Sequence, residues 1–179
     1  KSVTNLKPEE IRSGLIETSK YRHLDSWHRE AALEAATKAR KKGIPVVLDA
    51  DIPAYDANIS QLIQLTDILI TSQSFAQMFT KTDVVNISID KMISLGPSVV
   101  MVTLGKNGVV CEGGGERFKT PAFEIEVVDT TGAGDVFHGA FIHAMLQDWS
   151  LQKAVEFASA VSAIKCGMMG GRDGIPTFL

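Results

Sequence analysis

The sequence predicts a three-layer α/β sandwich built on a mainly parallel β-sheet. The first indication is a set of short, almost continuous apolar runs, as expected for strands that are covered on both faces; these runs are residues 44–49, 67–71 and 98–104. Helical patterns separate the runs, and such alternation is typical of a parallel sheet. The third indication is a glycine-rich turn at 129–135 that leads into a helix. We expect residues 1–179 to form a single α/β domain.

The first half of the chain alternates short helices with strands. An additional strand is expected at 20–25, and helices are expected at 7–18, 26–42, 58–65, 74–80 and 88–95. Ser26 can cap the second of these helices, because a serine hydroxyl accepts a hydrogen bond from a first-turn N–H group. Basic residues at 40–42 suit the negative end of the helix dipole, and Gly43 suits the position after the last turn.

An antiparallel excursion follows the strand at 98–104. Asn107-Gly108 favours a turn, because both residues readily take positive φ. Gly113-Gly114-Gly115 suits the tip of a hairpin, and Pro121 should interrupt the extended chain that follows. The elements expected here are a return strand at 109–112, an extended segment at 118–128, helices at 133–147 and 150–165, and a loop at 167–176.

Ligands of such sheets bind beyond the carboxyl ends of the strands. That rule places Asp49, Thr71, Thr103 and the 129–135 turn along one edge of the predicted sheet. The chemistry of the protein is therefore expected at this edge.

Composition excludes several classes of function. The net charge is −3 and the longest basic run is Arg40-Lys41-Lys42, which gives no electrostatic basis for nucleic-acid binding. No apolar run approaches the ~20 residues that span a bilayer, so no membrane partner is expected. Cys111 and Cys166 form no disulfide framework. We expect a cytoplasmic protein without a signal peptide.

The turn at 129–135 has the features of a phosphate site. Gly132 and Gly134 flank Ala133, so the backbone can turn tightly and lie close to a ligand. A helix that starts here presents unpaired N–H groups and the positive end of its dipole, which suit a phosphate. Asp135 falls in the first turn, where a carboxylate could take a proton from an attacking hydroxyl. The alternative is an ordinary strand–loop–helix connection.

A longer motif favours the functional interpretation. Residues 129–140 read D-T-T-G-A-G-D-V-F-H-G-A. This stretch resembles the C-terminal signature of the ribokinase (PfkB) carbohydrate kinase family, D-[ST]-[ST]-G-A-G-D-x-F-x-G-A, at every defined position. The resemblance implies a ribokinase-like fold, of which the N-terminal part and the lid over the sugar are missing here. Whether the chain is a piece of a longer protein stays open.

The resemblance also implies a set of site residues. Asp135 would be the general base, and the N–H groups of Gly132, Ala133 and Gly134 would form an anion hole for the γ-phosphate of ATP. The T-L-G turn after residue 102 would lie along the nucleotide, and the helix and loop from 157 to 171 would wall the adenine; plain turn formation and core packing are the alternatives. The implied nucleotide-binding residues are Thr103, Gly105, Gly108, Thr131, Ser159, Cys166 and Gly167.

Two metal ions follow from the resemblance. Mg²⁺ would bridge the phosphates of ATP. Family members often bind a monovalent cation such as K⁺ beside the loop, and the matching positions are Asp129 and Thr131, with carbonyl groups around Cys166, Met169 and Gly171. Many members carry an N-x-x-E pattern after the strand that matches 67–71, but the sequence there is Thr-Ser-Gln-Ser-Phe. How Mg²⁺ is held is therefore left open.

The predicted function is transfer of the γ-phosphate of ATP to an alcohol group of a small sugar, a ketose or a pentose. Lys165-Cys166-Gly167 and Asp173-Gly174-Ile175 resemble the ketohexokinase branch of the family, whereas Trp27 stands where that branch has an arginine. The family resemblance also allows a homodimer. Two alternatives remain: a catalytically degenerate nucleotide-binding domain, and a nucleoside or hydroxymethylpyrimidine kinase. His143 is expected to have a surface or core role.

Overall fold

The computed structural model describes residues 6–51 and 57–177. The chain forms two compact units: Lys1–Val102 with Glu112–Glu116, and Thr103–Cys111 with Arg117–Leu179. Each unit is described by itself, and the single domain expected over residues 1–179 stays a prediction.

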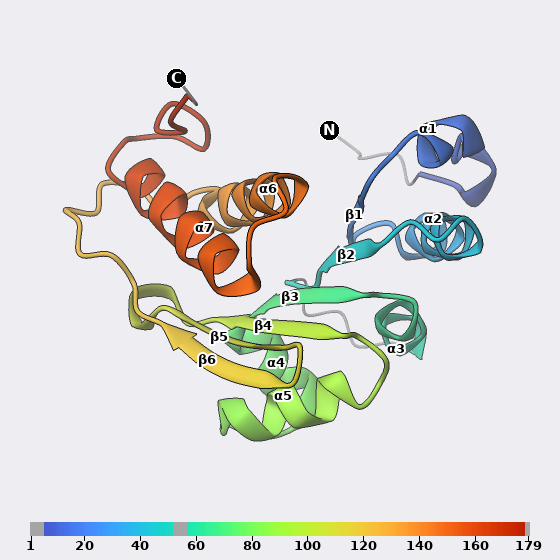
Figure 1. The fold of residues 1–179 in the computed structure, drawn as a ribbon, viewed down its shortest axis with the longest axis horizontal. Coiled ribbons are helices and arrows are strands. Elements are labelled where there is room, and N and C mark those ends of the chain that lie inside the picture. Colours follow the sequence, from blue (N-terminus) through green and yellow to red (C-terminus); the bar gives the residue numbers. More distant parts are fainter. Residues whose placement is uncertain (1–5, 52–56, 178–179) are drawn as a thin grey trace. The chain divides into compact units, whose positions relative to one another are not determined.

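The first unit is built on parallel strands. These are β1 (Arg22–Asp25), β2 (Val46–Asp49), β3 (Ile68–Ser72) and β4 (Val99–Thr103), drawn as neighbouring arrows in Figure 1. β1 pairs in parallel with β2, and β2 in parallel with β3, so that Asp25 lies opposite Asp49. Val46, Val47 and Leu48 are fully buried. The continuous apolar runs thus form buried parallel strands, as predicted.

Within residues 6–51 and 57–102, six helical segments accompany these strands. α2 packs on β1, β2 and α3, and α4 packs on β3 and α5. α2 turns a buried face of alanines inward, which allows close packing; these are Ala31, Ala32, Ala35, Ala36 and Ala39. The segments are η1 (Pro8–Glu10), α1 (Ser13–Glu17), α2 (Arg29–Lys41), α3 (Ala57–Gln64), α4 (Gln73–Thr80) and α5 (Val85–Ile93).

Two expectations for this unit are corrected. The helix expected at 7–18 is divided in two, because Ile11 and Arg12 take extended angles and the Glu10 carboxylate closes the first turn by accepting the Lys7 N–H at 2.8 Å. Ser26 does not cap α2: the N-cap is His28. The Ser26 hydroxyl is buried and has no hydrogen-bond partner among the described residues.

The second unit contains the last two helices and most of the hairpin, whose residues Glu112–Glu116 belong to the first unit. The elements in this part of the chain are η2 (Gly105–Asn107), β5 (Val109–Gly113), β6 (Glu116–Thr120), α6 (Ala133–Leu146) and α7 (Leu151–Cys166). β5 and β6 complete the strand order β1-β2-β3-β4-β5-β6. α6 and α7 pack against each other, side by side in Figure 1. Ser150 caps α7, its hydroxyl accepting the Lys153 N–H at 3.4 Å.

The extended segment expected at 118–128 forms a strand only before Pro121, where the expected break is confirmed. β6 stops at Thr120, and residues 121–128 form no strand. Pro121 has no N–H to donate to a ladder, and Phe123, Val127 and Val128 leave much of their side chains exposed. Among the described residues, no helix is both long and apolar enough to cross a membrane.

Candidate functional site

The start of α6 is shaped by Gly132. This residue is the N-cap, with φ 73° and ψ 9°, a left-handed conformation that favours glycine. A Cβ atom at Gly132 would lie 3.1 Å from the Gly171 carbonyl oxygen, so a side chain would also be crowded. The glycine predicted from the motif is therefore required both by its backbone angles and by its neighbour.

Unpaired N–H groups occur at this helix start. The Ala133 N–H donates to the Thr130 carbonyl at 3.1 Å, so one of the three groups expected in the anion hole is already engaged. The N–H groups of Gly132, Gly134 and Asp135 have no acceptor within the described parts of the chain. Free donors at the positive end of a helix dipole suit an anion, so these residues fit the terminal phosphate that the motif predicts.

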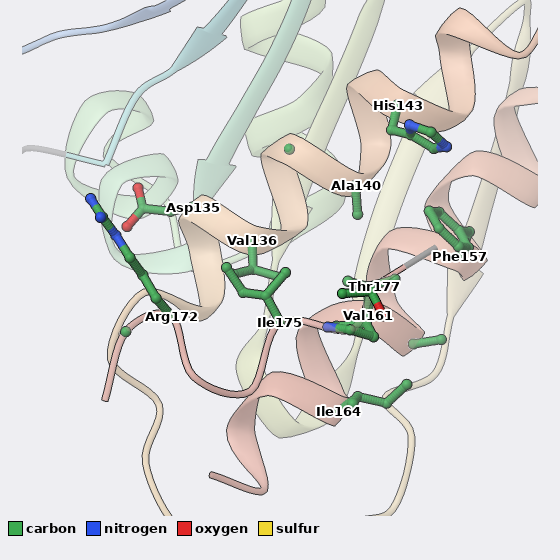
Figure 2. A pocket seen from close by; sticks show the side chains of 14 residues that line it. Asp135, Val136, Ala140, His143, Phe157, Val161, Ile164, Arg172, Ile175 and Thr177 are labelled. Atoms are coloured by element: carbon green, nitrogen blue, oxygen red, sulfur yellow. The ribbon is translucent and has the colours of Figure 1, made fainter. Parts of the chain in front are cut away.

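Asp135 lies in the first turn of α6 with its side chain exposed. Its carboxylate makes no hydrogen bond or ion pair with any described residue. It therefore keeps all its acceptor capacity for a ligand. Arg172, from the tail after α7, lines the same pocket, and Figure 2 shows both side chains at one end of it.

The pocket has a volume of about 680 Å³, within the range of small-molecule sites. α6, α7 and the tail form its walls. Its lining is mainly apolar, with charged groups at the Asp135 end; the residues are Asp135, Val136, Gly139, Ala140, His143, Phe157, Ala160, Val161, Ile164, Gly171, Arg172, Ile175, Pro176 and Thr177. The side chain of Asp135, the base predicted from the motif, thus lines a cavity rather than a flat surface.

Asp129, at the other end of the loop, is bonded through its backbone and through both carboxylate oxygens. Its Oδ1 accepts the Thr131 N–H at 2.9 Å, and its Oδ2 accepts the Gly170 N–H at 2.7 Å. Its own N–H donates to the Cys166 carbonyl at 3.1 Å, and its carbonyl accepts Lys165 Nζ at 2.7 Å. Asp129 therefore ties the loop before α6 to the end of α7.

These bonds favour the ionised form of Asp129. The pKa of its carboxyl is lowered from 3.8 to about 2, mainly by the Thr131 N–H, then by the Thr131 hydroxyl and the Gly170 N–H. The positive charge of Lys165 lowers the pKa further, and desolvation opposes these effects. Asp129 is thus a permanent anion at neutral pH, held as part of the scaffold.

The predicted nucleotide residues of the hairpin occupy a tight turn. Gly105 and Gly108 both have positive φ, at 55° and 89°. A Cβ atom at Gly108 would lie only 2.0 Å from the Thr120 carbonyl oxygen, whereas one at Gly105 would meet no atom within 4 Å. Gly108 is therefore required by the fold, while the open space at Gly105, next in the chain to Thr103-Leu104, leaves the backbone accessible to a ligand.

The other predicted nucleotide residues belong to the framework around the loop. The Ser159 hydroxyl donates to Val155 of its own helix at 2.8 Å. The Cys166 side chain is buried, and its carbonyl accepts the N–H groups of both Val128 and Asp129. Gly167 ends α7. None of these three lines the pocket described above.

Sequence reasoning did not find Arg172 and assigned His143 a surface or core role, yet both line the pocket. A basic residue in a glycine-rich tail was an available signal for Arg172, because arginine recognises phosphate and carboxylate groups well. His143 gave no such signal, since only the packing of α6 on α7 turns it toward the cavity.

The stretch after β3 has no carboxylate that could organise a metal ion. Ser72 caps α4, its hydroxyl accepting the Phe75 N–H at 3.2 Å, and the residues that follow are Gln73 and Ser74. This stretch offers hydroxyl and amide groups but no carboxylate. It does not match an N-x-x-E pattern.

Comparison with known proteins identifies similar sequences. The family described as pfkB family carbohydrate kinase matches residues 4–178. A ribokinase of Haemophilus influenzae is 35% identical over 149 residues, which are 80% of this chain and 48% of the relative. An ATP-dependent 6-phosphofructokinase of Thermoanaerobacterium thermosaccharolyticum is 30% identical over 176 residues, 90% of this chain and 55% of the relative. The chain spans about half the length of these relatives.

Solved structures agree on the ribokinase-like fold. Ribokinase from Thermotoga maritima matches with a TM-score of 0.84 and 29% identity, over 95% of this chain and 58% of that one. An Escherichia coli protein provisionally assigned as Ribokinase II, in complex with ATP and Mg²⁺, matches with a TM-score of 0.85 and 22% identity, over 96% and 60% of the two chains. At that identity the second match shows the fold alone.

Proposed function

The chain belongs to the pfkB family of carbohydrate kinases, and we propose that the protein containing it transfers the γ-phosphate of ATP to an alcohol group of a small sugar. The observation that carries the proposal is the Asp135 carboxylate, which has no partner among the described residues and faces a pocket beside free N–H groups. An unbonded acid next to an anion site is what phosphoryl transfer to a hydroxyl requires.

Each group at the start of α6 has a distinct role in this proposal. Asp135 accepts the proton of the attacking sugar hydroxyl. The free N–H groups of Gly132 and Gly134 stabilise the negative charge that develops on the transferred phosphoryl group. Ala133, whose N–H is bonded to Thr130, contributes the turn between the two glycines. Mg²⁺, when bound with ATP, neutralises phosphate charge.

The remaining nucleotide contacts are assigned by family resemblance. They are Thr103, Gly105, Gly108, Thr131, Ser159, Cys166 and Gly167. The positive φ and open surroundings of Gly105 support its place in this set. Cys166 and Gly167 lie at the end of α7, where the Cys166 carbonyl holds the start of the 129–135 loop by accepting the N–H groups of Val128 and Asp129.

The substrate class proposed is a pentose or a ketose. Similarity to a ribokinase and to a 6-phosphofructokinase supports small sugars and sugar phosphates as acceptors. The Lys165-Cys166-Gly167 and Asp173-Gly174-Ile175 stretches support a ketose, as in ketohexokinases, and Trp27 opposes it. A cytoplasmic homodimer is part of the same proposal.

A second candidate function is nucleotide binding without phosphotransfer. The absence of a carboxylate in the stretch after β3 favours it, since that position helps organise Mg²⁺ in many family members. ADP release by the full-length protein, measured against a panel of pentoses, ketoses and their phosphates, separates the two. Sugar-dependent ADP release supports the kinase, whereas ATP binding without turnover on any sugar supports the second candidate.

A further inference from the structure

Arg172 follows a stretch of backbone that is tied to the loop before α6. The Gly170 N–H donates to Asp129 Oδ2 at 2.7 Å. Gly171 lies against the N-cap of α6, since a Cβ atom placed on Gly132 would be 3.1 Å from the Gly171 carbonyl oxygen. The residues just before Arg172 are therefore fixed at the turn that the motif predicts as the phosphate site.

The tail is also held on the other side of Arg172. Gly174 is buried, and a Cβ atom there would lie 2.5 Å from the Lys165 carbonyl oxygen, so the backbones of the tail and of α7 are in close contact. The Ile175 N–H donates to the Arg172 carbonyl at 3.0 Å and closes a turn between the two. Arg172 thus stands on an anchored segment and not on a free end.

The guanidinium group of Arg172 is available to a ligand. The side chain is exposed and makes no hydrogen bond or ion pair with any described residue. Figure 2 shows it at the same end of the pocket as the Asp135 carboxylate. Among the described residues that line this pocket, Arg172 is the one lysine or arginine. Its five donors form a planar fork that matches the oxygens of a phosphate.

The neighbourhood of Asp135 indicates which phosphate Arg172 would meet. In the proposed reaction, Asp135 marks the place where the acceptor hydroxyl meets the γ-phosphate. The negative charge of Asp135 repels that phosphate, and the helix start offers only about half a positive charge against it. A full positive charge beside Asp135 offsets the repulsion. A phosphate already carried by a sugar acceptor sits on a different carbon from the attacking hydroxyl, and so farther from Asp135.

We propose that Arg172 is a further catalytic residue, which binds the γ-phosphate of ATP and stays bound to the phosphoryl group during transfer. The inference rests on the proposed function. In the step, the acceptor oxygen forms a bond to the γ-phosphorus while the bond from that phosphorus to the β–γ bridging oxygen breaks. The proton of the hydroxyl goes to Asp135, and the electron pair of the broken bond stays on ADP. Arg172 donates hydrogen bonds to non-bridging oxygens of the transferred group.

The test measures nucleotide binding, which requires no turnover. Isothermal titration gives the Kd of the full-length protein and of its Arg172→Gln variant for ADP and for a non-hydrolysable ATP analogue, each with Mg²⁺ and without sugar. Glutamine keeps a polar side chain but removes the charge. The Kd for the analogue should rise about tenfold or more, as expected for a lost charge-assisted hydrogen bond. The Kd for ADP should stay the same, because ADP has no γ-phosphate.

Arg12→Gln is the matched control. Arg12 is exposed in the first unit and its side chain is bonded to no described residue, so the variant loses the same charge elsewhere and should keep both Kd values. Arg172→Lys, which keeps the charge without the fork, should lose less affinity for the analogue than Arg172→Gln. With an accepted neutral sugar, Arg172→Gln should also lower kcat by about 10²-fold without raising the KM for the sugar.

Three results would overturn the proposal. Equal losses of affinity for the analogue and for ADP would mean that Arg172 supports the site as a whole. Unchanged affinity for both would mean that it does not meet the γ-phosphate. An effect limited to the KM of phosphorylated sugars would assign Arg172 to the acceptor. A protein that binds nucleotide but phosphorylates no sugar contradicts the kinase proposal alone, and the comparison of analogue with ADP still decides the role of Arg172 in binding.

Discussion

Two aspartates of the same loop have opposite surroundings. Asp129 uses its N–H, its carbonyl and both carboxylate oxygens in hydrogen bonds to the loop and to the end of α7. Asp135 is exposed, and its carboxylate is bonded to no described residue. The first acid is part of the structure, and the second is available for chemistry.

The glycines of the second unit show the same contrast. Gly108 and Gly105 share positive φ, yet only Gly108 is enclosed by neighbouring backbone. Residue type and local geometry therefore do not distinguish a structural position from an accessible one. What distinguishes them is whether another segment of the chain has already taken up the available space and hydrogen-bonding groups.

Replacing Asp135 by asparagine is expected to have the largest effect. Asparagine keeps the shape of the side chain but cannot accept the proton, so kcat should fall by about 10²–10⁴-fold. The KM for ATP and the Tm should stay nearly unchanged, because the carboxylate makes no bond that the described structure depends on. Steady-state kinetics and thermal unfolding measure both. Turnover close to that of the unmodified protein would exclude Asp135 as the base.

The two hairpin glycines provide the next test. Gly108→Ala combines positive φ with a Cβ atom driven against the Thr120 carbonyl, and should lower the free energy of unfolding by about 2–4 kcal/mol. Gly105→Ala is the matched control: it has positive φ but open space, and should cost only about 1–2 kcal/mol. Urea unfolding of the two variants gives the difference. Equal losses would mean that the contact with Thr120 is relieved at no cost.

The sequence alone predicted the positions of those elements that depend on a local residue pattern. The strands at β2, β3 and β4 and the start of α6 lie within two residues of their predicted positions, because continuous apolar runs and a glycine-rich helix start depend little on distant residues. The cap expected at Ser26 and the extended run expected after Pro121 were mispredicted because both depend on distant residues. A capping hydroxyl can be buried by its surroundings, and an extended run becomes a strand only where a neighbouring strand pairs with it.

The candidate site likewise contains some residues that a local motif predicts and others whose surroundings it does not predict. Its anion loop and Asp135 follow from a contiguous motif, and the structure brings them together at the start of one helix. The burial of Lys165 beside Asp129 was not predicted, since a lysine in the last turn of a helix normally interacts with the helix dipole in solvent. The tail also returns to the backbone of Lys165 at Gly174, a contact between segments that no local pattern records.

The smallest expected effect is a pH dependence of stability caused by Asp129. Its pKa is lowered to about 2 in the folded protein and is near 3.9 when unfolded. A lowered carboxyl pKa stabilises the fold above the unfolded value, and this contribution is lost as pH falls toward the folded value. Asp129→Asn should therefore have a lower Tm than the unmodified protein at pH 6, and the gap should narrow as the pH falls from about 4 toward 2. Asp135→Asn, which removes one equal charge from the same loop, is the control for net charge; a gap for Asp129→Asn that stays constant over this range would show that the hydrogen bonds of Asp129 do not favour its ionised form.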